Sequence, residues 1–238
     1  MQIFKIILGT AIIFAGCNVG GKSVAGNGNV KTETRNISGF TGVKSSGSID
    51  VVITQGTNFS VYVENDENLI PLIVTEVRDG ILVINYKDEY NINDDHSTVT
   101  VSAPEINKVA VSGSADIKTT GTLKSDKEIS FAISGSGNIC ANVNAPSVKF
   151  SGSGSGDISL DGNTKDFACK MSGSGEIKCG NLKAENVDLS ISGSSGAKVF
   201  ASVSLKARVS GSGDVIYYGN PQNPEIHVAG SGTVTAGK

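Results

Sequence analysis

The sequence predicts an all-β protein: a parallel β-helix (solenoid) with coils of about 19–20 residues and an irregular N-terminal cap. Two observations carry this prediction: a serine- and glycine-rich motif recurs at a nearly constant spacing, and apolar residues line up at that same spacing. Composition agrees, because Gly and Ser contribute 60 of 238 residues while 38% of residues are hydrophobic and lie among them. A flexible linker would not need so many apolar residues, so we expect a core.

The repeated motif has the form S-G-S-x-[D/N/E]-[I/V]. Successive copies start 22, 19, 19, 20, 18 and 19 residues apart. They begin at Ser112, Ser134, Ser153, Ser172, Ser192, Ser210 and Ala229, the copy at Ser192 being looser than the others. Seven copies at nearly one period indicate a repeat architecture rather than a linker.

Positions outside the motif also align. Three residues before each start stand Val109, Phe131, Phe150, Cys169, Leu189, Ala207 and Ile226, and five after it Ile117, Ile139, Ile158, Ile177, Ala197, Val215 and Val234. Polar residues alternate with these columns, which predicts short strands with one buried and one wet face. Such strands bury their apolar faces by stacking on the next copy, so contacts should be near in sequence. An antiparallel sandwich is the rival, but it gives no reason for whole columns to align.

Residues 34–108 look different from the regular repeat and are interpreted as irregular coils with a cap, followed by the repeat β-helix at 109–238. The segment Asp66–Val77 has helical spacing of apolar residues, although Pro71 makes any helix short or absent. Asp88–Asp95 is expected to be an exposed acidic loop. A cap is needed because the end of a solenoid exposes unpaired strand edges.

The first sixteen residues are interpreted as a signal peptide, with Lys5 before a nine-residue apolar run that is too short to span a membrane. Residues 15–17 (Ala-Gly-Cys) resemble a bacterial lipobox, which implies lipidation at Cys17. An ordinary secretory signal with an incidental Cys is the alternative. Residues 17–33 would then be the lipidated Cys and a flexible tether, with Lys22–Asn29 rich in Gly and Asn. The predicted location is the bacterial cell envelope, as an outer membrane lipoprotein on the surface or periplasmic face.

Charge and rare residues exclude several classes of function. Removal of the signal peptide takes the formal charge from −3 to −4, which disfavours binding to nucleic acid. Only His96 and His227 are present, so imidazole catalysis and multi-His metal sites are poorly supplied. Three cysteines remain after Cys17, and we interpret them as small buried hydrophobes, leaving a disulfide between any two open: Cys140, Cys169 and Cys179.

An ordered set of N-terminal motifs precedes the repeats: Ile37–Phe40, Ser48–Val51 with Gln55–Gly56, Glu64–Leu69 and Asp79–Leu82. Together with the S-G-S-G-x-I repeats, this set resembles the putative auto-transporter adhesin, head GIN domain family of Bacteroidetes-type lipoproteins. The resemblance covers about residues 34–236. It implies a β-helix-like fold on an envelope lipoprotein and leaves the function less defined than the fold.

One column could carry chemistry. Four residues after the motif starts stand Asp116, Asn138, Asp157, Glu176 and Asp214. Stacked carboxylates repel each other, and a hard cation such as Ca²⁺ or a ligand would relieve the repulsion. The alternative is that these short polar side chains hydrogen-bond the backbone at the corners, with Lys178 softening the repulsion. No dedicated metal site, cofactor or catalytic residue is predicted.

The preferred function is non-enzymatic adhesion or surface binding, through many weak polar contacts to a glycan or a surface protein. The membrane is the other partner, through the lipid at Cys17. A carbohydrate-active enzyme (lyase or hydrolase) and a purely structural envelope spacer are the alternatives. The ligand, the membrane face and the oligomeric state are left open by the sequence.

Overall fold

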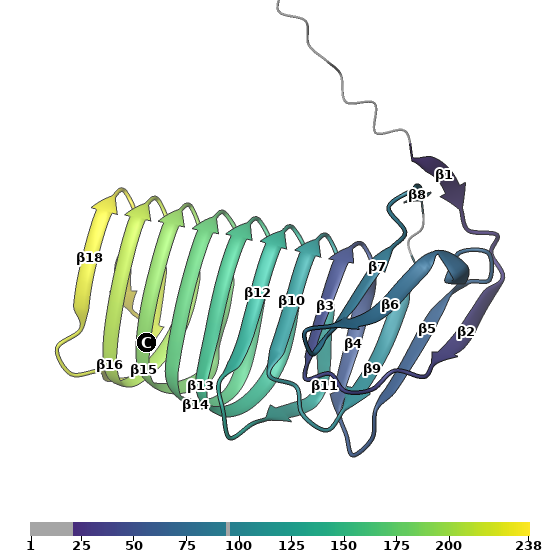
Figure 1. Cartoon of the computed structure of the whole chain (residues 1–238). Coiled ribbons are helices and arrows are strands. Elements are labelled where there is room, and N and C mark those ends of the chain that lie inside the picture. Colours follow the sequence, from purple (N-terminus) through teal and green to yellow (C-terminus); the bar gives the residue numbers. More distant parts are fainter. Residues whose placement is uncertain (1–20, 94–95) are drawn as a thin grey trace, which may run out of the picture.

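The computed structural model describes residues 21–93 and 96–238. Two walls of parallel strands face each other across a core and form the predicted β-solenoid (Figure 1). The front wall runs from β7 (Ile81–Tyr86) through β3 (Gly42–Gly47), β10 (Lys108–Gly113) and β12 (Ile129–Gly135) to β18 (Glu225–Gly230). The back wall contains β9 (Thr98–Ala103), β4 (Asp50–Gln55), β11 (Ile117–Lys124), β17 (Val215–Tyr218) and β19 (Val234–Ala236). Four long strands bend from the back wall into the front wall: β13 (Ile139–Gly154), β14 (Ile158–Gly173), β15 (Ile177–Gly193) and β16 (Ala197–Gly211).

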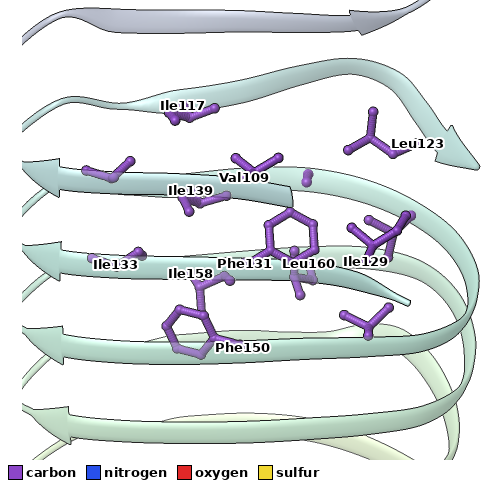
Figure 2. Packing of buried hydrophobic residues seen from close by; sticks show 14 of the residues in the cluster. Val109, Ile117, Leu123, Ile129, Phe131, Ile133, Ile139, Phe150, Ile158 and Leu160 are labelled. Carbon is purple, nitrogen blue, oxygen red and sulfur yellow. The ribbon is translucent and has the colours of Figure 1, made fainter. Parts of the chain in front are cut away.

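The predicted apolar columns are confirmed by the strand register. Phe131 pairs with Val109 on one side and with Phe150 on the other, and all neighbouring repeat strands are parallel. These side chains point into the core (Figure 2). Every coil adds buried apolar residues to the columns of both walls. This burial is the main source of stability, because each Å² of apolar surface removed from water contributes about 25 cal/mol to the free energy of unfolding.

Glycine at the corners is required by backbone geometry. Gly154 has φ +114°, and a Cβ there would overlap the carbonyl oxygen of Gly135 in the preceding coil. The close approach lets the N–H of Ser155 donate to that carbonyl at 2.9 Å. Equivalent bonds from Ser136 and Ser174 tie their corners to the coil before, so the S-G-S motif encodes a stacked turn.

The N-terminal coils stack in an order that differs from their order in the sequence. The coil of β3 and β4 lies between the outer coil of β7 and β9 and the first repeat coil of β10 and β11. Asp50 and Asp116 therefore lie in neighbouring coils although 66 residues separate them. The expectation that contacts would be near in sequence is wrong here. The chain first forms the inner coil (β3 and β4), then the outer coil (β7 and β9), and only then returns to pair β10 and β11 with the inner coil.

Antiparallel strands close the N-terminal end. β5 (Ser60–Asp66) pairs with β9, and β2 (Val30–Arg35) pairs with β5. On the front wall, β6 (Ile73–Arg78) pairs with β7. The possible helix over Asp66–Val77 is reduced to one 3₁₀ turn, Ile70–Leu72, because Pro71 stands in it and Ile73 is already extended. No described helix is long and apolar enough to cross a bilayer.

Two loop expectations need correction. Within the expected tether, β1 (Lys22–Ala25) pairs in parallel with β8 (Tyr90–Asn93), and the N–H of Gly28 donates to Asp66 at 3.1 Å. The expected acidic loop therefore contains a strand, while residues 94–95 and Cys17 lie outside the described residues.

At the opposite end of the solenoid, every residue of β18 is exposed, and β18 pairs only with β16 among the described strands.

The cysteines divide into two kinds. Cys169 and Cys179 are buried as expected, and burial raises the pKa of the Cys179 thiol to about 12 and that of Cys169 well above its usual value. Cys140 is exposed, so the prediction that it is buried is wrong: it falls on the outward phase of β13, next to inward Ile139. All three thiols are free, and the buried pair is unreactive because the thiolate is disfavoured.

Candidate functional site

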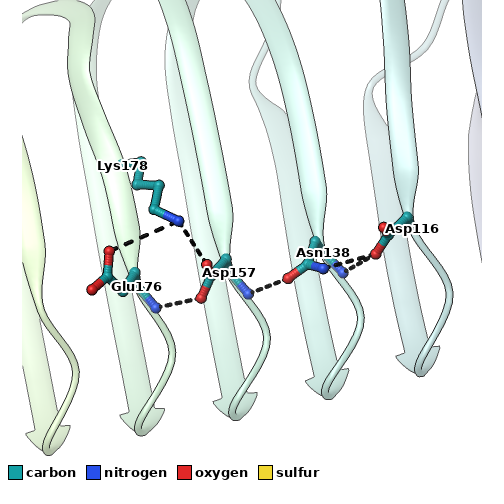
Figure 3. Close-up of polar contacts among 5 residues, drawn as sticks. All are labelled: Asp116, Asn138, Asp157, Glu176 and Lys178. Carbon is teal, nitrogen blue, oxygen red and sulfur yellow. Dashed lines mark hydrogen bonds and ion pairs between the residues drawn. The ribbon is translucent and has the colours of Figure 1, made fainter.

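The polar column predicted from the repeat is present as a ladder of hydrogen bonds (Figure 3). The N–H of Asn138 donates to Asp116 Oδ1 at 3.2 Å, and its side-chain amide donates to the same oxygen at 2.8 Å. The N–H of Asp157 donates to Asn138 Oδ1 at 2.9 Å, and the N–H of Glu176 donates to Asp157 Oδ1 at 2.8 Å. Each side chain therefore caps a backbone group of the next coil, as short polar side chains do in turns.

Lys178 lies beside two stacked carboxylates of the ladder, Asp157 and Glu176. Its Nζ lies 2.8 Å from Asp157 Oδ2 and 3.8 Å from Glu176 Oε2. Partial burial opposes ionisation of Asp157, but the hydrogen bonds from Lys178 and from the Glu176 N–H hold its pKa below the usual value. The hydrogen bond to Asp157 also raises the pKa of Lys178.

The ladder is longer than the sequence pattern and is interrupted. Asp50 begins it, since its Oδ1 accepts from the N–H of Asp116 at 2.8 Å. Gly196 has no side chain at this position, and Asp214 forms a separate step by accepting from the N–H of Thr233 at 3.0 Å. Asp50 was missed although residues 46–51 (Ser-Gly-Ser-Ile-Asp-Val) match the motif, because this copy stands 66 residues before Ser112 and not one period before it. The motif itself was the available signal.

These contacts define what the ladder can do. Its oxygens already accept backbone and lysine hydrogens, and no group of three or more His, Cys, Asp or Glu in residues 21–93 and 96–238 could hold a metal ion. The ladder therefore serves the stacking of the coils.

A continuous groove runs along the outer face of the front wall, parallel to the solenoid axis. It consists of two hollows, of about 1170 and 600 Å³, which share Ser151, Gly152 and Ser153. We call it the front groove. A column of outward serines, one per coil, follows its length: Ser112, Ser134, Ser153, Ser172, Ser192 and Ser210.

Basic side chains line the front groove, and no aspartate or glutamate does: Lys44, Lys108, Lys170, Arg208 and His227. Arg208 is paired with Asp188 at 3.2 Å, beside the groove. The three lysines have no hydrogen-bond or ion-pair partner among the described residues. A chain with a net charge of −3 thus presents one positively charged, hydroxyl-rich surface.

The family model described as "Putative auto-transporter adhesin, head GIN domain" matches residues 39–221. The chain belongs to this family. The resemblance that the N-terminal motifs and repeats indicated is therefore confirmed.

Solved structures share the fold. A putative adhesin from Bacteroides fragilis NCTC 9343 is 22% identical, with a TM-score of 0.83 over 90% of this chain and 99% of that one. A putative lipid binding protein from Parabacteroides distasonis ATCC 8503 is 25% identical, with a TM-score of 0.76 over 91% and 100%. A putative adhesin from Parabacteroides merdae ATCC 43184 is 24% identical, with a TM-score of 0.65 over 92% and 100%. The comparison with curated proteins finds no match.

Proposed function

We propose that this protein is a non-enzymatic adhesion protein of the bacterial cell envelope that binds an acidic glycan along the front groove. The observation that carries the proposal is the charge of the groove: it is lined by unpaired lysines and serine hydroxyls and by no carboxylate. Membership of an adhesin family supports the adhesive role.

A linear glycan fits the shape of the surface. Strands of one wall stack about 4.8 Å apart, so each coil offers a serine hydroxyl at a regular step along the chain of sugars. Each contact is weak, but many contacts on one chain add up through effective concentration. Lysine amines then select for carboxylate or sulfate groups on the sugars and raise the association rate.

The absence of carboxylates from the groove disfavours hydrolysis there, because glycosidases use a pair of carboxyl groups. Lyases need a base beside the acidic sugar, and His227 is the one imidazole among the residues that line the groove. A single imidazole on an open wall lacks the neighbours that orient a catalytic base. Binding without turnover is therefore the function this surface supports best.

The test is binding of the full chain to a panel of acidic and neutral polysaccharides. Replacing Lys44, Lys108 and Lys170 together by Gln should weaken binding to the acidic members by about tenfold or more and reduce its salt dependence. The matched control replaces Lys118, Lys124 and Lys165, which lie outside the groove, by Gln. If both triple variants bind alike, or if only neutral glycans bind, the proposal is wrong.

We further propose that Cys17 carries the lipid that holds the protein on the outer membrane, with the residues before it removed as a signal peptide. The lipobox-like residues 15–17 support this anchor. Growth with a labelled fatty acid should label the wild-type protein and leave the Cys17→Ser variant unlabelled and released from the membrane fraction. Equal labelling of both proteins would contradict lipidation at Cys17.

A further inference from the structure

The back wall carries a second hollow, of about 510 Å³, where the regular repeat breaks down. It lies over β14, β15, β16 and β17, beside the polar ladder. The pairing of β14 with β15 shifts register between Ser159 and Gly162, and that of β15 with β16 shifts between Cys179 and Lys183. Residues 180–182 bulge from β15 with no partner on β16. Bulges re-aim side chains and are common next to binding sites.

Tyr218 forms one side of this hollow and is held there by two glycines. A Cβ on Gly180 would lie 3.2 Å from ring atom Cε2 of Tyr218, and a Cβ on Gly237 would overlap Cε1. The absence of side chains at both positions therefore makes room for the ring. The Tyr218 hydroxyl has no hydrogen-bond partner among the described residues, so it can still donate to a ligand.

A second aromatic ring and its cation stand beside Tyr218. Phe200 pairs with Tyr218 on adjacent strands, and Nζ of Lys183 lies 4.1 Å from the centroid of the Phe200 ring. Both rings are partly exposed. Apart from Phe200, Tyr217 and Tyr218, the aromatic side chains of the repeat are buried in the core, at Phe131, Phe150 and Phe167.

The polar groups around the hollow include both donors and acceptors. Asp161 and Lys198 line it and make no ion pair with the described residues. Lys178 lines it too, but its amine is held by Asp157 of the ladder, 2.8 Å away. The ladder thus fixes the position of one residue of the hollow. Because Asp157 offsets the charge of Lys178 and Asp161 offsets that of Lys198, the hollow favours a ligand with neutral hydroxyls.

We propose that this hollow binds a single neutral sugar ring, at a site separate from the front groove. The C–H face of a sugar packs on the electron-rich face of an aromatic ring, here that of Tyr218. Asp161 accepts from sugar hydroxyls, while Lys198 and the Tyr218 hydroxyl donate to them. A few convergent polar groups beside aromatic side chains are typical of small-ligand sites. An adjoining hollow of about 360 Å³ shares Lys183 and Phe200 and leaves room for a second sugar.

The experiment measures binding of neutral methyl glycosides of glucose, galactose, mannose and N-acetylglucosamine to the full chain, by ligand-observed NMR. We expect at least one to bind with a dissociation constant on the order of millimolar. Tyr218→Ala should weaken that binding by about tenfold or more, while Tyr218→Phe, which keeps the ring, should weaken it by less than about threefold. Gly180→Ala, whose methyl group would crowd the ring, should also reduce affinity.

Two controls keep the result interpretable. Tyr62→Ala removes an exposed tyrosine on the N-terminal cap and should leave binding unchanged. Asp161→Asn alters the hollow without removing a ring, so it tests the site even if Tyr218→Ala fails to fold, and it should weaken binding. The triple lysine variant of the front groove should bind the glycosides like the wild type. Absence of binding by all four glycosides, or equal binding by the wild type and Asp161→Asn, would overturn this proposal and leave that of the front groove standing.

Discussion

Ser195 is a residue that the repeat does not need. At its position, other coils carry glycine, as at Gly156 and Gly175, which are buried like Ser195. Ser195 is 0% exposed, and its hydroxyl has no hydrogen-bond partner within the described part of the chain. An unpaired buried hydroxyl costs on the order of 1–3 kcal/mol relative to a paired one.

Replacing Ser195 by Ala should therefore raise the free energy of unfolding, by about 1 kcal/mol. The change removes the unpaired oxygen and keeps the Cβ that the site already holds. Urea denaturation followed by circular dichroism measures it. Ser194→Ala, in the exposed neighbouring position, should change little, and a loss of stability in Ser195→Ala would contradict the argument.

Asp157 gives the stability of the ladder a dependence on pH. Because its pKa is lower in the folded protein than in the unfolded chain, ionisation favours folding. This contribution is complete above the unfolded pKa, about 3.9, and is lost as the pH falls through the folded pKa. Its size is small, since the pair with Lys178 is partly exposed and screened by solvent.

Asp157→Asn keeps an oxygen that can accept from the N–H of Glu176 but removes the charge that faces Lys178. The wild type should be slightly more stable than this variant at pH 6, and the difference should vanish near pH 2. Urea midpoints measured at both pH values test the prediction. A difference that persists unchanged at pH 2 would show that Asp157 acts through its shape and not through its charge.

At the scale of elements, strand positions in the repeat were predictable because the apolar residues stand at fixed distances before and after each motif start. Phe131, Phe150 and Cys169 fall in one column in the sequence and in one column in the core. The strands β1 and β6 were not predictable in the same way. The segment Lys22–Ala25 is too short and too polar to be predicted as a strand. Its partner β8 lies in an acidic segment whose composition predicts a loop. Pairing with a distant edge, and not local propensity, makes it a strand.

The candidate sites show the same division. The polar ladder could be located because it repeats with the motif, but its role required the hydrogen bonds. The front groove also follows the motif, because its serine column consists of the motif starts. The Tyr218 hollow arises from a register shift, which leaves no repeated pattern. Lys170, Arg208 and His227 each stand two residues before a motif start, so the repeat places them in one column of the front wall.

The two ends of the solenoid should differ in local stability. The N-terminal end is closed by antiparallel β2 and β6, whereas β18 is exposed along its whole length, with Ile226 37% and Val228 41% exposed. Backbone amides of β18 should therefore exchange with deuterium faster than those of β14, which is paired on both sides. Hydrogen exchange with mass spectrometry measures both strands in one experiment. Equal protection would mean that β18 is covered in solution.

At the scale of the whole molecule, the division into a cap at 34–108 and a repeat at 109–238 does not correspond to a break in the stack. Val109, the first apolar residue of the repeat, pairs with Val43 on one side and with Phe131 on the other, and it is fully buried. The sequence carries this correspondence, because Val43 stands three residues before a copy of the motif at residues 46–51, as Val109 does before Ser112, but 66 residues separate the two copies. The N-terminal coil therefore covers the repeat in the way that one repeat covers the next.

This continuity makes Val109→Ala a test of the whole architecture. Removing two buried methyl groups should cost about 2–3 kcal/mol through lost transfer energy and the cavity that remains. The cavity borders β3 and β12, which pair with β10 on either side, so hydrogen exchange should accelerate in both strands, although β3 lies outside the regular repeat at 109–238. Val203→Ala, at a position 49% exposed, should affect neither. If exchange in Val109→Ala accelerates in β12 but not in β3, the cap and the repeat unfold as separate units, although their strands stack without a break.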